Sequence, residues 1–199
     1  MKYNIRKYIL AGITAILAAA VLTACGGSKP EKDDTVKSTQ EIFAMDTYMS
    51  LTAYGSNSEE AVSKAVQEIN RLDAMFSVGN EDSDVTKINE NGSGEVSEET
   101  AFIMNRAMQV SKETKGAFDI TIYPVMELWG FTTKNYRVPE SSEIADVLKH
   151  VSYTNVEVNG QQVTLSDGAS IDLGGIAKGY TSSRVIQIMK DCGIAVSYT

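Results

Sequence analysis

Two hydrophobic periodicities of different length follow one another between residues 48 and 76, and this succession limits the folds open to the chain. Apolar and polar residues alternate over 48–54, which predicts a half-buried strand that ends at Gly55. From Ser58 to Phe76 apolar residues recur every three or four positions, which predicts an amphipathic helix capped by Ser58. A strand followed directly by such a helix requires a fold that mixes the two.

The rest of the chain continues this mixture. Asn159-Gly160 separates two alternating runs, 155–158 and 162–166, and favours the type I′ turn of a β-hairpin. Because no regular βαβ rhythm is visible, we predict an α+β fold of mixed helices and antiparallel sheet in one domain over 41–199. Further strands are expected at 170–173 and 194–198, and further helices at 97–116, 141–149 and about 178–192, the first of them burying Phe102, Ile103, Ala107 and Val110.

The N-terminus has the pattern of a bacterial export signal. A basic start is followed by an apolar stretch too short to span a bilayer and then by Leu22-Thr23-Ala24-Cys25, which resembles a lipobox. We therefore predict a lipoprotein signal peptide over 1–24, a diacylglyceryl group on Cys25, and a flexible tether over 25–40. The expected location is the outer face of a bacterial cell membrane, with Cys25 held in its lipid. The alternative is a secreted protein in which this cysteine is incidental.

Charge and residue counts exclude several classes of function. The sequence has 26 Asp and Glu against 18 Lys and Arg, and three of the basic residues fall in the predicted signal, so a nucleic-acid partner is not expected. With Cys25 lipidated, Cys192 is left without a disulfide partner. His150, the one histidine, ends a predicted helix, where a solvated side chain that complements the helix dipole is expected rather than a member of a Ser/His/Asp triad. One histidine and one free cysteine are too few for a Cys/His zinc site.

Two segments carry candidate binding residues. In Ile171–Tyr180 an extended run meets Gly174-Gly175 and then a helix, an arrangement that suits a phosphate, with Lys178 adding a positive charge. A tight turn with an exposed lysine explains the same residues. In Gly116–Pro124, Asp119 and Thr121 share one face of an extended run, where they could bind a ligand or cap the next element.

Taken in order, these pieces resemble the FAD:protein FMN transferase (ApbE) family. The resemblance rests on the lipobox and on four motifs spread over about residues 41–195: Met45-Asp46-Thr47, Leu72-Asp73-x-x-Phe76-Ser77 with Asp82-Ser83 and Asn89, Gly116-Ala117-Phe118-Asp119, and Asp172-Leu173-Gly174-Gly175-Ile176-Ala177-Lys178-Gly179-Tyr180. It implies a Mg²⁺-dependent enzyme that moves the FMN half of FAD through a phosphoester bond onto a threonine or serine hydroxyl of exported flavin-accepting electron-transfer proteins, with release of AMP.

The resemblance also implies roles for individual residues. Met45 would line the FAD site, and Ala117, Phe118 and Asp119 would contact the flavin nucleotide. Asp172 and Lys178 would bind FAD around its phosphates, and a backbone carbonyl of the glycine turn, that of Gly175, would ligate Mg²⁺.

Two features of the chain differ from the family pattern. Many members place a tyrosine that stacks on the flavin ring at the position of Gly79. The family also has a C-terminal portion with further Mg²⁺ ligands, so we expect this chain to correspond to the N-terminal part of such a domain. Two other functions stay open: a lipid-anchored protein that binds or scavenges FAD without turnover, and an FAD pyrophosphatase that uses water as acceptor.

Overall fold

The structure is a computed structural model that describes residues 36–195, 197 and 198. The predicted signal peptide, Cys25 and most of the predicted tether lie outside the described residues. Within the described part, no helix is both long enough and apolar enough to cross a bilayer.

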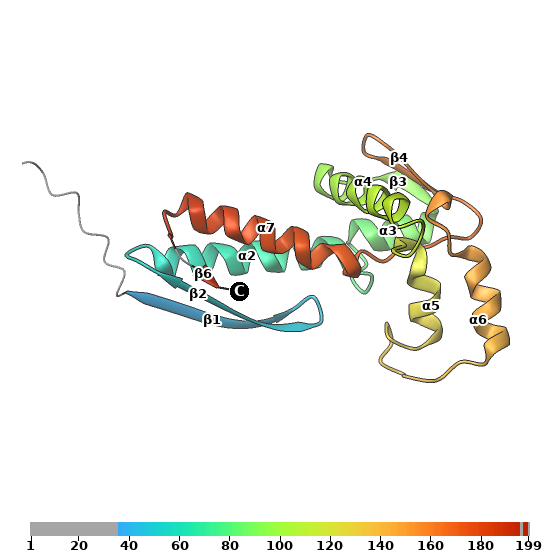
Figure 1. Cartoon of the computed structure of the whole chain (residues 1–199), viewed down its shortest axis with the longest axis horizontal. Coiled ribbons are helices and arrows are strands. Elements are labelled where there is room, and N and C mark those ends of the chain that lie inside the picture. Colours follow the sequence, from blue (N-terminus) through green and yellow to red (C-terminus); the bar gives the residue numbers. More distant parts are fainter. Residues whose placement is uncertain (1–35, 196, 199) are drawn as a thin grey trace, which may run out of the picture. The chain divides into compact units, whose positions relative to one another are not determined.

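The first sheet is antiparallel and has the strand order β1-β2-β6 (Figure 1). Its strands are β1 (Lys37–Ala44), β2 (Thr47–Tyr54) and the short β6 (Ser197–Tyr198), which pairs with β2. The predicted strand at 48–54 is therefore confirmed, and the predicted terminal strand has a partner. β1 begins at Lys37, inside the segment expected to be a tether, because its residues pair along the whole length of β2.

The turn between β1 and β2 is strained. Ala44 pairs with Thr47, so Met45 and Asp46 are the two central residues, and their φ angles are 51° and 54°. Two positive φ values define a type I′ turn, which normally contains glycine or asparagine. A left-handed backbone is unfavourable for a residue with a side chain, more so for methionine than for aspartate.

We expect Asp46→Gly to stabilise the ligand-free protein by about 0.5–1 kcal/mol, because glycine adopts the left-handed conformation without steric cost. Thermal unfolding followed by circular dichroism measures the effect. Asp46→Ala is the matched control, since it removes the same carboxylate and keeps the strain. A glycine variant no more stable than the alanine variant would contradict the explanation.

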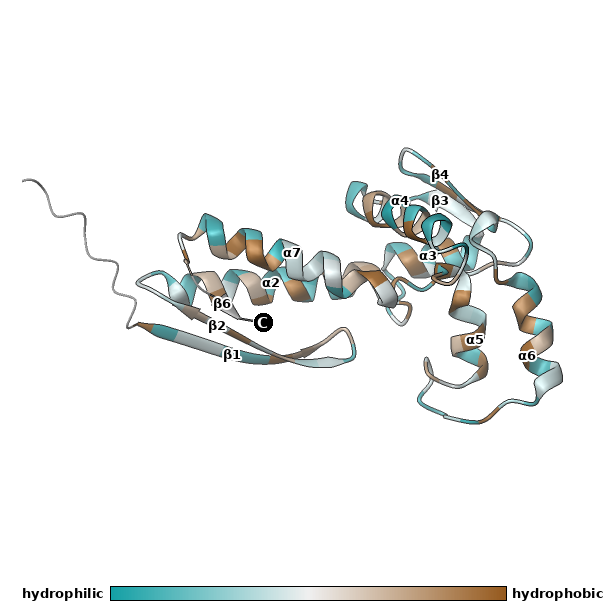
Figure 2. Ribbon diagram, viewed as in Figure 1, coloured by the Kyte–Doolittle hydropathy of each residue, from teal (hydrophilic) through white to brown (hydrophobic). Residues whose placement is uncertain are grey.

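The first hydrophobic core lies between this sheet and two long helices, α2 (Ser58–Phe76) and α7 (Gly174–Asp191). Apolar and polar residues alternate along both helices, and the two lie side by side (Figure 2). α2 has the predicted bounds, but its N-cap is Asn57 and Ser58 is buried in its first turn. The fully buried side chains of this core include Leu51, Ala53, Ala61, Ala65 and Met189.

The second core joins the other ends of α2 and α7 to a second antiparallel sheet, of order β3-β5-β4. It includes α3 (Asp84–Asn91), β3 (Ser93–Glu95), α4 (Glu98–Glu113), β4 (Val156–Asn159) and β5 (Gln162–Leu165). The predicted hairpin is confirmed, but its turn is centred on Gly160 and Gln161, and only Gly160 has a positive φ. A glycine at the first central position is typical of type II′, so the expected type I′ turn is wrong.

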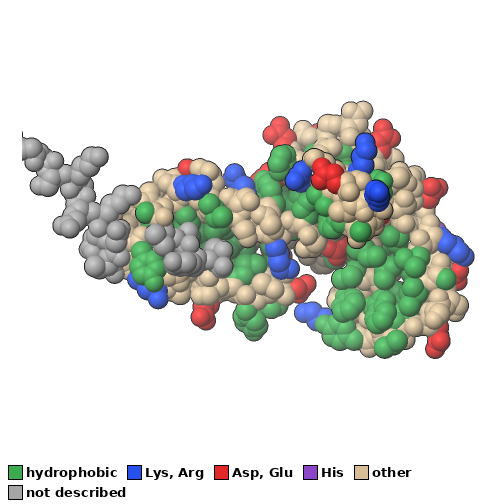
Figure 3. Space-filling view, viewed as in Figure 1, with side chains coloured by type: hydrophobic (Ala, Val, Ile, Leu, Met, Phe, Trp, Pro, Cys, Tyr) green, Lys and Arg blue, Asp and Glu red, His purple; other side chains and the backbone are tan. Residues whose placement is uncertain are grey.

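The segment between α4 and β4 buries few of its side chains outside η1. It holds η1 (Ile120–Ile122), α5 (Tyr123–Leu128), α6 (Ser141–Val147), η2 (Leu148–His150) and η3 (Tyr153–Asn155), and neither α5 nor α6 has a buried residue. Hydrophobic side chains gather over this segment in the space-filling view (Figure 3). Its large exposed apolar side chains are those of Phe131, Tyr136, Val138 and Leu148.

The α+β class is confirmed, and the helices expected at 97–116 and 141–149 are present as α4 and as α6 with η2. Two local predictions are wrong. Phe102 is 61% exposed and Val110 is only half-buried, because the buried face of α4 follows Ile103 and Ala107. Residues 170–173 form no strand, because their backbone bonds to a side chain and to a distant loop instead of to a neighbouring strand.

Candidate functional site

A cavity of about 800 Å³ opens where the second core meets the tip of the first hairpin. Its volume falls within the range of small-molecule sites, about 300–1,000 Å³. The lining residues come from five places in the chain: the hairpin tip (Met45, Asp46), the C-terminal end of α2 and the two residues after it (Asp73, Phe76, Ser77, Val78), the segment before and within α5 (Gly116, Ala117, Phe118, Asp119, Ile122, Met126), the segment before β4 (Leu148, Val151), and the start of α7 (Asp172, Gly174, Gly175, Ala177, Lys178).

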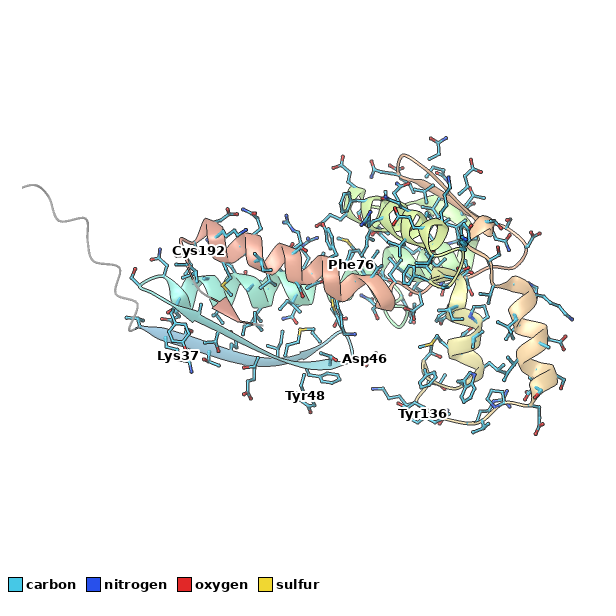
Figure 4. All side chains as sticks on the ribbon, in the orientation of Figure 1. Lys37, Asp46, Tyr48, Phe76, Tyr136 and Cys192 are labelled. Carbon is cyan, nitrogen blue, oxygen red and sulfur yellow. The ribbon has the colours of Figure 1, made fainter. Side chains whose placement is uncertain are left out.

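All seven residues expected to bind FAD or Mg²⁺ line this one cavity: Met45, Ala117, Phe118, Asp119, Asp172, Gly175 and Lys178. Their roles toward a ligand stay predictions. Asp46 at the hairpin tip and Phe76 at the end of α2 are labelled in Figure 4 and mark two sides of the cavity. Residues far apart in sequence therefore meet in one place.

The wall before α7 is held by an asparagine. The Asn89 Nδ2 donates to the Ile171 carbonyl at 2.8 Å, and the Ile171 N–H donates to Asn89 Oδ1 at 2.7 Å. One residue further on, the Asp172 N–H donates to the Ile120 carbonyl at 2.8 Å. These three bonds replace the ladder of a strand, and they tie the start of α7 to the segment that carries Phe118 and Asp119.

Gly174 and Gly175 form the first turn of α7 instead of a break between a strand and the helix. α7 begins at Gly174, four residues earlier than expected. A Cβ on Gly175 would lie 2.9 Å from Phe118 Cε2, and one on Gly174 would lie 2.9 Å from Asp172 Oδ1. Both glycines are needed because side chains pack directly against the first turn of the helix.

This first turn is only partly free to bind an anion. The Gly174 N–H donates to Asp172 Oδ1 at 2.6 Å, so the carboxylate already uses one of the helix-end donors. Among the described residues, the Gly175 N–H has no acceptor and the Lys178 ammonium has no partner. These two groups can attract a phosphate. The Asp172 carboxylate would repel one, so it suits a hydroxyl, an N–H group or a cation better.

Asp119 caps the next element, as one of the two sequence interpretations proposed. Its Oδ1 accepts from the Thr121 N–H at 2.8 Å and from Thr121 Oγ1 at 2.7 Å, and its Oδ2 accepts from the Tyr153 N–H at 2.7 Å. The predicted extended run is wrong, because η1 follows at Ile120. This bonding fixes the loop that places Ala117 and Phe118 in the cavity wall.

Met45 is positioned by the strained hairpin turn. Its side chain packs against the second core, and its Sδ accepts a weak hydrogen bond from Thr181 Oγ1 at 3.6 Å. The turn thus places the side chain of Met45, a residue of the first sheet's hairpin, against Thr181 of α7.

The donors for a magnesium ion are incomplete in the described part of the chain. Within residues 36–195, 197 and 198, no three Asp, Glu, His or Cys side chains lie close enough together to hold a metal ion. The Gly175 carbonyl belongs to the first turn of α7, where it accepts from an N–H four residues on, so a cation would share it. Mg²⁺ demands six oxygens, and these residues do not form its site by themselves.

A cluster of charged side chains holds the three helices behind the cavity together. Arg71 on α2 contacts Glu68 at 2.8 Å and Glu99 of α4 at 2.6 Å. From α7, Arg184 contacts Glu68 at 3.1 Å and the Tyr180 hydroxyl donates to Glu99 at 2.8 Å. Hydrogen bonds from Arg71 lower the pKa of Glu68 and the pKa of Glu99, while burial and Glu99 raise the pKa of Tyr180.

Because of this charged cluster, we expect the free energy of unfolding to fall in acid. A carboxyl group whose pKa is lower in the folded state stabilises the protein above its ordinary pKa of about 4.3, and the contribution disappears as the pH falls through the folded value. We expect Glu99→Gln to lower the free energy of unfolding at pH 7 by up to about 1 kcal/mol and to reduce its decline below pH 4.5. Urea unfolding between pH 3 and 7 measures this, with Glu113→Gln on the same helix as control. Parallel pH profiles for wild type and Glu99→Gln would contradict it.

Sequence reasoning gave no role to several residues of the cavity. Asp46 and Asp73 were part of motifs, but nothing in a single sequence shows that both carboxylates reach the same space as Lys178. Met126 and Leu148 lie in the α5 and η2 segments, whose short helices have no distinctive spacing.

Comparison with known proteins was made by sequence and by structure. A model of the ApbE family matches residues 45–198. The FAD:protein FMN transferase of Haemophilus influenzae is 27% identical over 197 residues, covering 91% of this chain and 55% of that protein. The one from Escherichia coli is 26% identical over 197 residues, with 91% and 56% covered. This chain spans about half the length of the curated relatives it matches.

Comparison with solved structures also finds ApbE proteins. The ApbE protein of Thermotoga maritima aligns with a TM-score of 0.75 and 36% identity over 79% of this chain and 53% of that one. The flavin transferase ApbE of Vibrio cholerae aligns with a TM-score of 0.74 over 81% and 56%, but at 20% identity this likeness concerns the fold alone. Because the family model covers well over half of the sequence, the chain belongs to the ApbE family.

Proposed function

We propose that the chain forms the FAD-binding wall of an enzyme that transfers FMN from FAD to a threonine or serine hydroxyl of exported flavin-accepting electron-transfer proteins, with Mg²⁺ as an essential ion and AMP as the second product. The observation that supports this most is the convergence of Met45, Ala117–Asp119 and the start of α7 on one cavity of about 800 Å³. Its apolar side suits a flavin ring and its helix end suits a phosphate.

The reaction balances without any oxidant or reductant. The hydroxyl oxygen of the acceptor attacks the phosphorus of the FMN half, and the bond from that phosphorus to the bridging oxygen breaks. AMP leaves with the bridging oxygen, and the hydroxyl proton is released. Lys178 and the Gly175 N–H would hold the pyrophosphate and favour the charge that develops on the departing phosphate.

The test is covalent flavin transfer to a purified acceptor domain. The chain, and the natural protein in which the sequence occurs, are incubated with FAD, MgCl₂ and the domain, and the products are separated on a denaturing gel. We expect a fluorescent acceptor band and one AMP per flavin attached. An acceptor whose target threonine is replaced by alanine, and a reaction with EDTA, are the controls.

The outcomes distinguish flavin transfer from FAD hydrolysis and from FAD binding without turnover. AMP formed without any acceptor would favour hydrolysis of FAD to FMN and AMP. Stoichiometric FAD binding without AMP over hours would favour a flavin-binding protein without turnover. No covalent FMN from the natural protein would refute the transferase proposal.

We also propose that Cys25 carries the lipid and holds the protein at the outer face of the membrane. The support is the sequence Leu22-Thr23-Ala24-Cys25 after a basic and apolar leader. Mass spectrometry of the mature N-terminal peptide tests it, and an unmodified cysteine in the exported protein would contradict it.

A further inference from the structure

Asp73 is a residue of the cavity wall whose charge is unfavourably placed within its own helix. It lies in the last turn of α2, a helix of 19 residues that has no basic residue in that turn. The C-terminal end of a helix carries a partial negative charge, so a carboxylate there is unfavourable. The side chain is half-buried and lines the cavity.

The Asp73 carboxylate also lacks compensation from the protein. Two other cavity carboxylates, those of Asp119 and Asp172, each accept hydrogen bonds from backbone N–H groups. Within residues 36–195, 197 and 198, the carboxylate of Asp73 has no hydrogen-bond or ion-pair partner. A charged group placed at the wrong end of a helix and left unpaired in a cavity departs from the local rules of stability, and such departures are expected at functional sites.

The position of Asp73 limits which part of a ligand it can contact. An ionised carboxylate only accepts hydrogen bonds, so it repels phosphate and attracts hydroxyl and N–H donors. Phe76, three residues further on, shares its face of α2, and Ser77 follows directly after the helix; both also line the cavity. The basic group and the free helix-end N–H lie instead on the wall formed by the start of α7.

We propose that Asp73 is a specificity-determining residue that accepts hydrogen bonds from the sugar hydroxyl groups of the bound nucleotide. Paired hydroxyls match the two oxygens of a carboxylate, as in the acidic residues that bind ribose in dinucleotide folds. This inference rests on the proposed function, since it assumes FAD as the ligand. FAD offers such hydroxyls in two places, its ribityl chain and its ribose.

The experiment measures the affinity of the wild-type chain and of its variants for three ligands by isothermal titration. We expect Asp73→Ala to weaken FAD binding about 10- to 100-fold and Asp73→Asn to weaken it less, because the amide keeps one acceptor. FMN carries only the ribityl chain and ADP only the ribose, so the ligand that loses affinity identifies the hydroxyls. The matched control is Asp191→Ala, which removes a carboxylate from the last turn of α7, away from the cavity.

A second measurement distinguishes this role from a structural one. Removing the Asp73 charge from the end of α2 should leave the melting temperature of the ligand-free protein unchanged or higher. A structural role would lower that temperature, and a drop in Asp73→Asn would overturn the proposal. Wild-type FAD binding that both Asp73 variants retain in full would overturn it too, and leave the proposed function intact. A wild-type chain that binds none of the three ligands would overturn both.

Discussion

Replacing Lys178 with glutamine is expected to weaken FAD binding about 10- to 100-fold, the range set by one charge-assisted hydrogen bond to a phosphate. Lys178 supplies the one cationic side chain among the residues that line the cavity, where it stands against the carboxylates of Asp46, Asp73, Asp119 and Asp172. Without it, the pyrophosphate would meet a wall of negative charge. Affinity measured by quenching of flavin fluorescence should also lose part of its dependence on salt.

The matched control is Lys190→Gln. Lys190 lies in the last turn of the same helix, outside the cavity, so the variant has the same net charge and a similar helix propensity. FAD affinity should stay within about twofold of wild type, since a surface charge beyond a screening length of about 10 Å has little effect. Equal losses in the two variants would mean that Lys178 acts only through net charge, and the assignment of the phosphate to the start of α7 would fail.

Asn89→Ala should cause the largest loss of stability of any single change near the site, about 2–4 kcal/mol. It leaves the N–H and the carbonyl of Ile171 without their partner, and each unpaired buried backbone group costs about 1–3 kcal/mol. The melting temperature should fall by about 5–15 °C. FAD binding should weaken as well, because the segment leading to Gly175 loses its fixed position.

Asn91→Ala is the control for this variant. Asn91 is exposed on the same helix, and its amide bonds only to the Lys87 carbonyl of its own turn. Its replacement should change the free energy of unfolding by about 0.5 kcal/mol or less. A similar cost for both asparagines would show that the bonds across to Ile171 contribute nothing beyond those of an ordinary helix residue.

The parts of the fold that sequence predicted are those where periodicity and burial agree. α2 follows from a long amphipathic repeat, and the β4–β5 hairpin follows from two alternating runs around Asn159-Gly160. The prediction for α7 placed its start too late, because a glycine pair ordinarily disfavours a helix. Here both glycines are retained in the first turn by the close approach of Phe118 and Asp172, which no local pattern reveals.

For the site too, local sequence patterns predicted some features, whereas contacts between residues far apart in the sequence could not be predicted. The family resemblance pointed to seven residues that do line one cavity, and the structure explains why Asn89 accompanies them, since it bonds to Ile171. An acidic run such as Glu81-Asp82-Ser83-Asp84 is typical of solvated surface, but two of its residues have structural roles here. Ser83 is buried and caps α3, and Asp84 accepts from the Ser97 N–H at 2.9 Å and from the Thr100 hydroxyl. These partners lie 13 and 16 residues away, beyond the reach of a charge pattern.

The Asn89 contact also determines how the protein can open. The amide protons of Ile171 and Asp172 are bonded to Asn89 and to Ile120, which lie far from them in the sequence. They can exchange with solvent only when α3 and the η1 segment separate from the start of α7. A swing of one surface loop therefore cannot detach this wall from the second core. Ligand release that opened it would require a cooperative opening of the second core, with a correspondingly high barrier and slow dissociation.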